Sequence, residues 1–424
     1  MANISAVDLA QEVLDACLKD GTWPARALDA LIERALDEGE PFTARAATRA
    51  LFSIIIERLG DLFEPELCEV YARLFSHVIA RALPDYDSKD LFLRYRRVRQ
   101  IRRFVGGEIR RVFVLSRVTL GADVAVTSVV LDAAKTRFPD AEICLVGPAK
   151  NAEMFAADAR VTSIPIVYGR SSLLRERIEA ALELHTIVDE VGTLVIDPDS
   201  RLTQLGLIPV CDDARYFFFE SRAFGGELGG TLTELTREWL SEVFDVELPR
   251  PYLAPLPEPP IAEVTVSFGV GDNPDKRIPG DFELQVIAAL LRDGRSVLID
   301  RGAGGEEADR VNAIAERLGN PELLHLHDGS YSSFASQIVQ SKLYVGYDSA
   351  GQHVASAARV PLVSVFMGFV CDRMFARWRP IGSTAHVVRV DVGEPSEAVL
   401  DRTLQAIAAA EAAGSAASRD RNPS

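Results

Sequence analysis

The residues with the clearest chemical potential follow one short apolar segment, Leu343–Val345, which reads as a buried strand. The next residues, 348–351 (Asp-Ser-Ala-Gly), have the composition of a tight turn, and an alanine-rich helix is expected after them. A helix that starts after a strand and a turn presents unpaired N–H groups and the positive end of its dipole. The pattern predicts a binding site for a diphosphate. Asp348 and Ser349 could cap the helix or hold a ligand hydroxyl, and His353 lies about one turn into it.

Two stretches of strands and helices must position these residues. In the first, Val112–Leu115 is a strand without polar alternation, as in parallel α/β sheets, and Ile143–Val146 completes a βαβ opening. The second follows Pro249–Pro260, which holds six prolines in twelve residues and has the composition of a linker. Strands at Val264–Phe268 and Ser296–Asp300 then lead back to the opening segment. We expect two Rossmann-like domains joined by a hinge.

The motif Asp-Ser-x-Gly-x-His-x-Ala at residues 348–355, with Arg-Trp-Arg-Pro-Ile-Gly at 377–382, resembles glycosyltransferase family 9. These are the heptosyltransferase-like enzymes of the GT-B fold, and about residues 106–400 carry the resemblance. Three departures from the family pattern are visible. Ala350 stands where the family usually has glycine, with Gly351 one step later, and one alanine is inserted in Gly121-Ala122-Asp123. Ile278 stands where the family has tryptophan after a Lys-Arg pair.

The resemblance implies a role for several residues. Asp123 corresponds to the general base, although an acidic residue at a helix start is equally well explained as an N-cap. Lys276 corresponds to a point charge on the departing diphosphate. Glu306, with Glu307 as an equal alternative, corresponds to the carboxylate that binds the nucleotide ribose. The donor-binding set is then Lys276, Arg277, Glu306, Asp348, Ser349, Ala350, Gly351 and His353.

A candidate acceptor site follows the predicted strand Leu194–Ile196. Arg201 and Gln204 lie in the polar segment after it, at the carboxyl edge where ligands of open α/β sheets bind. A polar loop with a helix start is an equally good interpretation. The aromatic segment Tyr216–Phe219 is either a buried strand, which we favour, or a platform for a sugar.

Residues 1–105 show apolar positions at helical spacing and are predicted to form an all-helical module that the resemblance does not cover. Its last helix, expected from Ser88 to Phe104, is dense in arginine. We favour a solvated face that pairs with acidic segments; the alternatives are an anionic acceptor, an acidic membrane surface or a partner subunit.

The composition limits the function classes. The chain has 424 residues, 48% hydrophobic and 25% charged, with a net charge of −16. The length suggests several domains, and the acidic charge argues against nucleic acid as a partner. Five scattered cysteines fit a reduced, intracellular protein without a metal motif. We expect a cytoplasmic protein without a signal peptide, with peripheral attachment to the inner membrane as an alternative.

The sequence thus predicts an α/β protein of the GT-B fold, its two Rossmann-like domains facing across a cleft. The predicted parts are a helical module (1–105), an acceptor domain (106–255), a donor domain (256–400), and a C-terminal helix with a frayed tail (401–424). The expected activity is inverting, metal-independent transfer of a sugar from a nucleotide-diphospho-sugar, by resemblance ADP-heptose, to a glycan, lipid-linked or protein acceptor in bacterial cell-envelope or protein glycosylation. No cofactor is expected. The alternative is a non-catalytic nucleotide-sugar-binding or assembly protein that acts through residues 1–105, as a homo-oligomer or with another protein.

Overall fold

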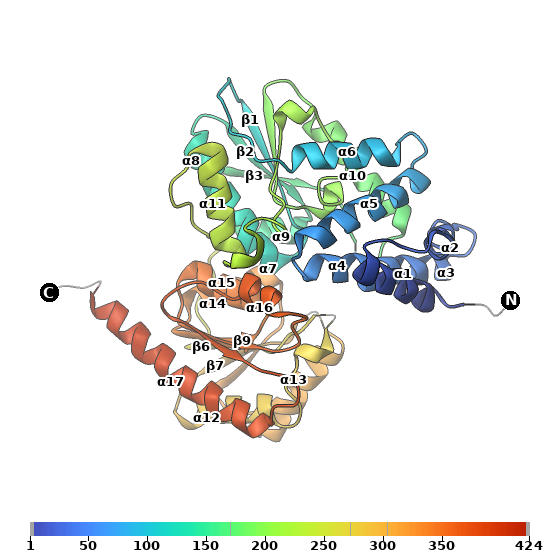
Figure 1. Ribbon diagram of the computed structural model, residues 1–424. Helices are drawn as coiled ribbons and strands as arrows, with labels where there is room; N and C mark the ends of the chain where they lie inside the picture. The colour runs from blue at the N-terminus through green and yellow to red at the C-terminus, as the bar shows by residue number, and fades with distance from the viewer. Residues whose placement is uncertain (1–3, 170, 272, 303, 421–424) are drawn as a thin grey trace. The chain divides into compact units, whose positions relative to one another are not determined.

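The computed structural model describes residues 4–169, 171–271, 273–302 and 304–420 and divides into two compact units (Figure 1). The first unit comprises Met1–Thr119, Val130–Ala152 and Arg160–Pro249. The second comprises Leu120–Val129, Glu153–Ala159 and Arg250–Ser424. Each contains its own parallel sheet, so the predicted fold class of two Rossmann-like sheets after a helical region is confirmed.

The first sheet has the strand order β3-β2-β1-β4-β5, and all its pairs are parallel. Its strands are β1 Arg111–Leu115, β2 Glu142–Gly147, β3 Val161–Pro165, β4 Thr193–Asp197 and β5 Tyr216–Phe218. The aromatic segment is therefore a buried strand, as favoured from the sequence. The edge strand β3 was not predicted, because most of its side chains are exposed and it lacks an apolar run.

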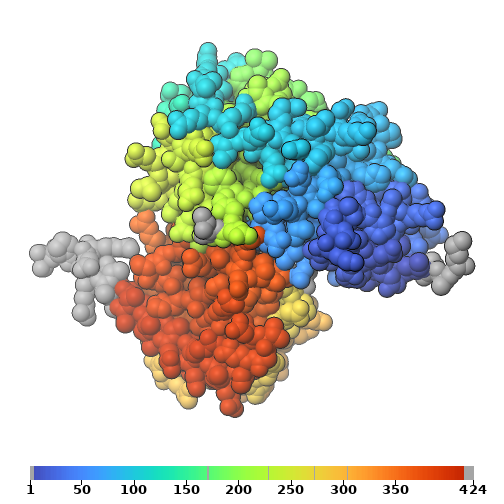
Figure 2. All heavy atoms as spheres, in the orientation of Figure 1, coloured from blue at the N-terminus to red at the C-terminus, as the bar shows by residue number. Residues whose placement is uncertain are grey.

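The N-terminal helices pack against this sheet and share one hydrophobic core with it. They are α1 Ala6–Asp20, α2 Ala25–Ala35, α3 Pro41–Ala50, α4 Glu57–Asp61, α5 Pro65–Ala82 and α6 Ser88–Val98. Tyr95 of α6, for example, packs on Phe218 of β5 with ring centroids 6.2 Å apart. In the space-filling view these helices, in blue, lie directly against the cyan and green part of the same unit (Figure 2).

The arginine-rich helix is shorter than predicted. It ends at Val98, six residues before Phe104. The backbone N–H of Phe104 donates to the Val243 carbonyl at 2.8 Å, and its ring packs among Phe138, Phe217 and Phe244. This tertiary contact, which helical spacing does not reveal, draws the chain away from the helix axis.

The other helices of the first unit follow its strands along the chain. They are α8 Ser128–Arg137, whose first two residues belong to the second unit, α9 Ala149–Ala152, α10 Leu174–Val188 and α11 Leu232–Phe244. Helix α10 contacts α5, and its Arg177 guanidinium lies 4.2 Å from the ring centroid of Phe52. The sheet, its crossover helices and the N-terminal helices therefore form one packed body.

The second sheet has the order β11-β10-β9-β6-β7-β8, again with all pairs parallel. Its strands are β6 Val264–Ser267, β7 Val297–Asp300, β8 Leu324–His327, β9 Leu343–Tyr347, β10 Leu362–Phe366 and β11 Ala385–Arg389. Helices of this unit are α7 Leu120–Ala122, α12 Phe282–Arg292, α13 Glu306–Arg317, α14 Tyr331–Gln340, α15 Ala350–Ala358, α16 Asp372–Trp378 and α17 Ser396–Asp420. The last four residues of the predicted frayed tail lie outside the described residues.

Residues 251–262, all within the described part of the chain, form neither helix nor strand, as their prolines predict. Side chains of α14 hold this segment: the Glu258 N–H donates to Ser336 Oγ and the Ile261 N–H to Gln337 Oε1. Across the described residues, none of the helices is both long and apolar enough to traverse a bilayer.

Candidate functional site

The carboxyl end of β9 leads into the start of α15, as the sequence predicts. Asp348 is buried and its N–H donates to the Val365 carbonyl, which fixes the turn against β10. Ser349 occupies the N-cap position, and Ala350 and Gly351 form the first helical turn. The Ser349 side chain makes no capping hydrogen bond to any residue that the structure describes. The backbone N–H groups of this turn are therefore free of a side-chain cap, and the helix dipole favours an anion there.

Lys276 lies at this helix start. Its Nζ is 2.7 Å from Asp348 Oδ2 and 3.2 Å from the Asp348 carbonyl oxygen. The lysine side chain is 17% exposed, so its ammonium is partly desolvated beside a buried carboxylate. The structure thus brings Lys276 and Asp348 together at the helix start where the sequence predicts a diphosphate site.

Gln352, which the sequence analysis did not single out, holds Asp348 from the other side. Its Nε2 donates to Asp348 Oδ1 and to the Trp378 carbonyl, and its Oε1 accepts from Ser364 Oγ at 2.6 Å. The residue is fully buried. Its place four residues after Asp348 was the only signal in the sequence, because it sets the two side chains one helical turn apart.

His353 is buried and packs against the ring of Trp378, with centroids 5.7 Å apart. Burial lowers its pKa to about 4; the Lys276 charge acts in the same direction and Asp348 opposes it. The imidazole is therefore neutral at physiological pH. It can hydrogen-bond a ligand, but it adds no positive charge to the helix start.

Within the second unit, α7 approaches the same helix start closely. A Cβ added to Gly121 would lie 3.2 Å from both Ala350 Cα and His353 Cδ2. Asp123 lies in the helix interior rather than at an N-cap, in a π-helical turn that spans Asp123–Thr127. A π turn accommodates one residue more than an α turn, which fits the extra alanine that the resemblance implies before Asp123.

The carboxylate of Asp123 is fully buried, and its Oδ1 accepts a hydrogen bond from Thr127 Oγ1 at 2.6 Å. A base in this environment must gain access to its substrate before it can take a proton.

The structure distinguishes the two glutamates proposed for the ribose. Glu306 is exposed, whereas Glu307 lies between two glycine-bearing loops. A Cβ added to Gly269 or Gly302 would lie 2.2 Å from a Glu307 carboxylate oxygen. Burial raises the pKa of Glu307, with Asp300 adding to the effect and nearby arginines opposing it. Glu307, unlike Glu306, therefore lies against the loops that follow β6 and β7.

Arg277 turns toward α12, with its Nε 4.0 Å from Glu283 Oε1. It is therefore directed at a buried carboxylate of its own unit rather than at Asp348.

In the first unit, the segment after β4 is enclosed. Gln204 is fully buried, has a left-handed φ of 52°, and donates from Nε2 to the Arg177 carbonyl at 2.9 Å. Its own carbonyl accepts from the Tyr71 hydroxyl of α5. Arg201 is half-buried. An acceptor could reach Gln204 only after this packing rearranged.

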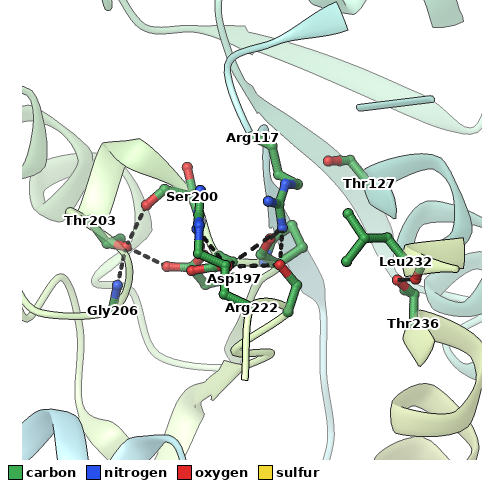
Figure 3. Close-up of polar contacts among 12 residues, drawn as sticks. Arg117, Thr127, Asp197, Ser200, Thr203, Gly206, Arg222, Leu232 and Thr236 are labelled. Carbon is green, nitrogen blue, oxygen red and sulfur yellow. Dashed lines mark hydrogen bonds and ion pairs between the residues drawn. The ribbon is translucent and has the colours of Figure 1, made fainter. Parts of the chain in front are cut away.

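A polar network organises the same segment (Figure 3). Asp197 at the end of β4 accepts hydrogen bonds from the Ser200 N–H, Thr203 Oγ1 and Tyr216 hydroxyl, at 2.6, 2.5 and 2.5 Å. Burial raises the pKa of Asp197 to about 6, against these three hydrogen bonds, which lower it. Arg222 donates to Asp199 at 2.6 Å. The network fixes the loop, which indicates a structural role for these buried charges.

Several arginines of α6 and the segment after it pair with acidic residues, as we favoured from the sequence, but Arg94 is buried rather than on a solvated face, and Arg102 donates to backbone carbonyls. Arg94 Nε donates to Asp213 Oδ1 at 2.7 Å, and Arg99 lies 2.7 Å from Glu220. These ion pairs tie the segment to the region around β5. Among the residues that the structure describes, no group of three or more His, Cys, Asp or Glu side chains is arranged to hold a metal ion.

Comparisons with known proteins agree with this architecture. No family model matches the chain. Over 96 residues, 22% of this chain, the sequence is 32% identical to lipopolysaccharide heptosyltransferase 3 of Escherichia coli, and the match spans 27% of that protein. The E. coli heptosyltransferase WaaC with ADP superposes with a TM-score of 0.52 at 15% identity, over 70% of this chain and 99% of WaaC. A family 9 glycosyl transferase from Veillonella parvula gives 0.53 at 15% identity, over 73% of this chain and 98% of that one. This chain therefore carries the GT-B fold of the heptosyltransferase-like enzymes of glycosyltransferase family 9, the family that its motifs resemble.

Proposed function

We propose that this protein is an inverting glycosyltransferase that takes its sugar from a nucleotide-diphospho-sugar bound by the second unit. The observation that carries the proposal is the uncapped start of α15 with Lys276 beside it. Backbone N–H groups, a helix dipole and an ammonium ion together suit a diphosphate that gains negative charge as the sugar leaves. We propose ADP-heptose as the first donor to test, because the WaaC structures that this fold resembles were solved with ADP and an ADP-heptose analogue.

Three candidate residues have a proposed part. Lys276 offsets the charge of the leaving diphosphate, and it can do so without a metal ion. Glu307 is our preferred ribose ligand over Glu306, because it lies in the cradle of the two glycine loops. Asp123 takes the proton of the acceptor hydroxyl once the acceptor and the carboxylate meet. We place the acceptor with the first unit.

The experiment is to incubate the full-length protein with ADP-heptose and other nucleotide-sugars, with glycan and lipid-linked acceptor extracts, and to measure nucleotide release. We expect acceptor-dependent release, and a loss of at least a hundredfold in turnover for both Asp123→Ala and Lys276→Ala. Lys342→Ala is the matched control, since this exposed lysine pairs with Glu263 and directly precedes β9, at the opposite end of that strand from the start of α15. Unchanged turnover in Asp123→Ala would exclude this residue as the base.

A second function, a non-catalytic nucleotide-sugar-binding or assembly protein, is favoured by one observation. Asp123 is fully buried and bonded to Thr127, as expected of a structural carboxylate. In that case calorimetry detects nucleotide-sugar binding, Lys276→Ala weakens it, and no acceptor extract yields free nucleotide. The helical region α1–α6 would then be the part that contacts a partner protein or a second copy of the chain.

A further inference from the structure

The N-cap serine of α15 behaves differently from the other serines at this position. Ser5, Ser200 and Ser330 each accept a hydrogen bond from a backbone N–H of the helical turn that they precede. Ser349 has an extended backbone, with φ −155° and ψ −175°, and its hydroxyl accepts none from the described residues. Serine is a strong N-cap residue, so the uncapped hydroxyl of Ser349 calls for an explanation.

Tyr344, the second residue of the segment Leu343–Val345, reaches this helix start from within β9. Its ring lies over Gly346, the next residue on the same face of β9: a Cβ added there would be 2.5 Å from the Tyr344 hydroxyl. The hydroxyl ends beneath the first turn of α15, 2.1 Å from the position of a Gly351 Cβ. The phenol therefore occupies the space that a side chain at residue 351 would need. This explains why glycine stands at 351 in this chain.

The Tyr344 side chain is fully buried. Its hydroxyl forms no hydrogen bond of standard geometry with any described residue. Burial raises its pKa, while the neighbouring hydroxyls of Ser349 and Ser267 lower it. The phenol is therefore a buried polar group beside the Ser349 hydroxyl, and it is directed at the start of a helix without a side-chain cap. A buried polar group of this kind lowers the stability of the fold unless it forms a hydrogen bond, for example with a ligand.

We propose that Tyr344 is a positioning residue for the donor diphosphate: its hydroxyl retains the Ser349 hydroxyl and so keeps the first N–H groups of α15 open to an anion. This inference rests on the proposed function, since the anion is the diphosphate of the donor. Without the phenol oxygen, Ser349 is free to rotate and cap its own helix. The diphosphate must then displace that cap before it binds.

The test is a double-mutant cycle with Tyr344→Phe and Ser349→Ala in the full-length protein. ADP, UDP and GDP are titrated by calorimetry, and the tightest is used as the probe. Competition by an N-cap of ordinary strength weakens nucleotide binding about fivefold in Tyr344→Phe. In the Ser349→Ala background the same change should alter binding less than twofold, because no cap can form. Thermal stability should stay equal or rise in Tyr344→Phe, which a simple packing defect would not produce.

Tyr331→Phe is the matched control, because it removes another phenol oxygen of the same unit that has no hydrogen-bond partner among the described residues. It should leave nucleotide affinity unchanged. Equal affinity of Tyr344→Phe and the parent, or an equal loss in both backgrounds, would overturn the positioning role while leaving the proposed function intact. If the parent binds none of the three nucleotides, the proposed function fails and the role of Tyr344 fails with it.

Discussion

Replacing Gln352 by methionine tests whether the site depends on the hydrogen bonds that hold Asp348. Methionine has a similar length, so it keeps most of the packing and removes the amide. The change removes one hydrogen bond to the Asp348 carboxylate and two neutral ones, to Trp378 and Ser364. A bond to a charged group contributes about 1.5–3 kcal/mol and a neutral one about 1 kcal/mol, so the loss is roughly 4 kcal/mol. Burial of the apolar side chain returns about 1 kcal/mol, which leaves a net destabilisation of roughly 3 kcal/mol.

The assay is urea and thermal unfolding of parent and variant, together with calorimetric titration of ADP. For a unit of this size, roughly 3 kcal/mol corresponds to a Tm lowered by about 6–12 °C. Nucleotide affinity should also fall, because Asp348 no longer holds Lys276 in one place. Gln285→Met, an exposed glutamine on α12, is the control and should change stability by less than about 0.5 kcal/mol. A loss below about 1 kcal/mol in Gln352→Met would show that the hydrogen bonds around Asp348 do not stabilise the site.

Three further predictions concern pH, packing and metal ions. The folded pKa of Asp197, about 6, exceeds the ordinary value of 3.8, so the folded protein holds a proton that the unfolded chain releases. Its contribution to stability is complete below pH 4 and falls by about 3 kcal/mol as pH rises to 6; Asp197→Asn should remove this slope in pH-dependent urea unfolding, and an unchanged slope would refute it. Gly206→Ala should destabilise by about 2–4 kcal/mol, because φ is +81° and the new Cβ would lie 2.8 Å from the Phe218 ring. Gly106→Ala, also at positive φ but without atoms within 4 Å among the described residues, should cost less in the same thermal unfolding assay. If Lys276 supplies the charge that the diphosphate needs, chelation with EDTA should leave nucleotide release unchanged, and loss of turnover that Mg²⁺ restores would contradict this.

Much of the fold could be predicted because the strands of a parallel sheet are buried on both faces. Val112–Leu115 and Leu343–Val345 are apolar runs that few other structures accommodate, and both are central strands. The edge strands β3 and β11 were missed because neither carries a long buried apolar run: β3 is mostly exposed, and β11 is mostly half-buried. The end of α6 was predicted too late because Phe104 is held by aromatic residues more than thirty positions away.

The sequence by itself determined the central strands of both sheets and the motif that places Asp348 and Ser349 at a helix start, because both depend on residues close together in the chain. Only the tertiary structure decided which side chains meet there. Lys276 pairs with Asp348 across 72 positions, and Glu307 rather than Glu306 enters the glycine cradle. Packing also enclosed Gln204 beneath α5. Such contacts depend on how the helices pack at the edges of the sheets. Helical or strand periodicity in the sequence does not predict them.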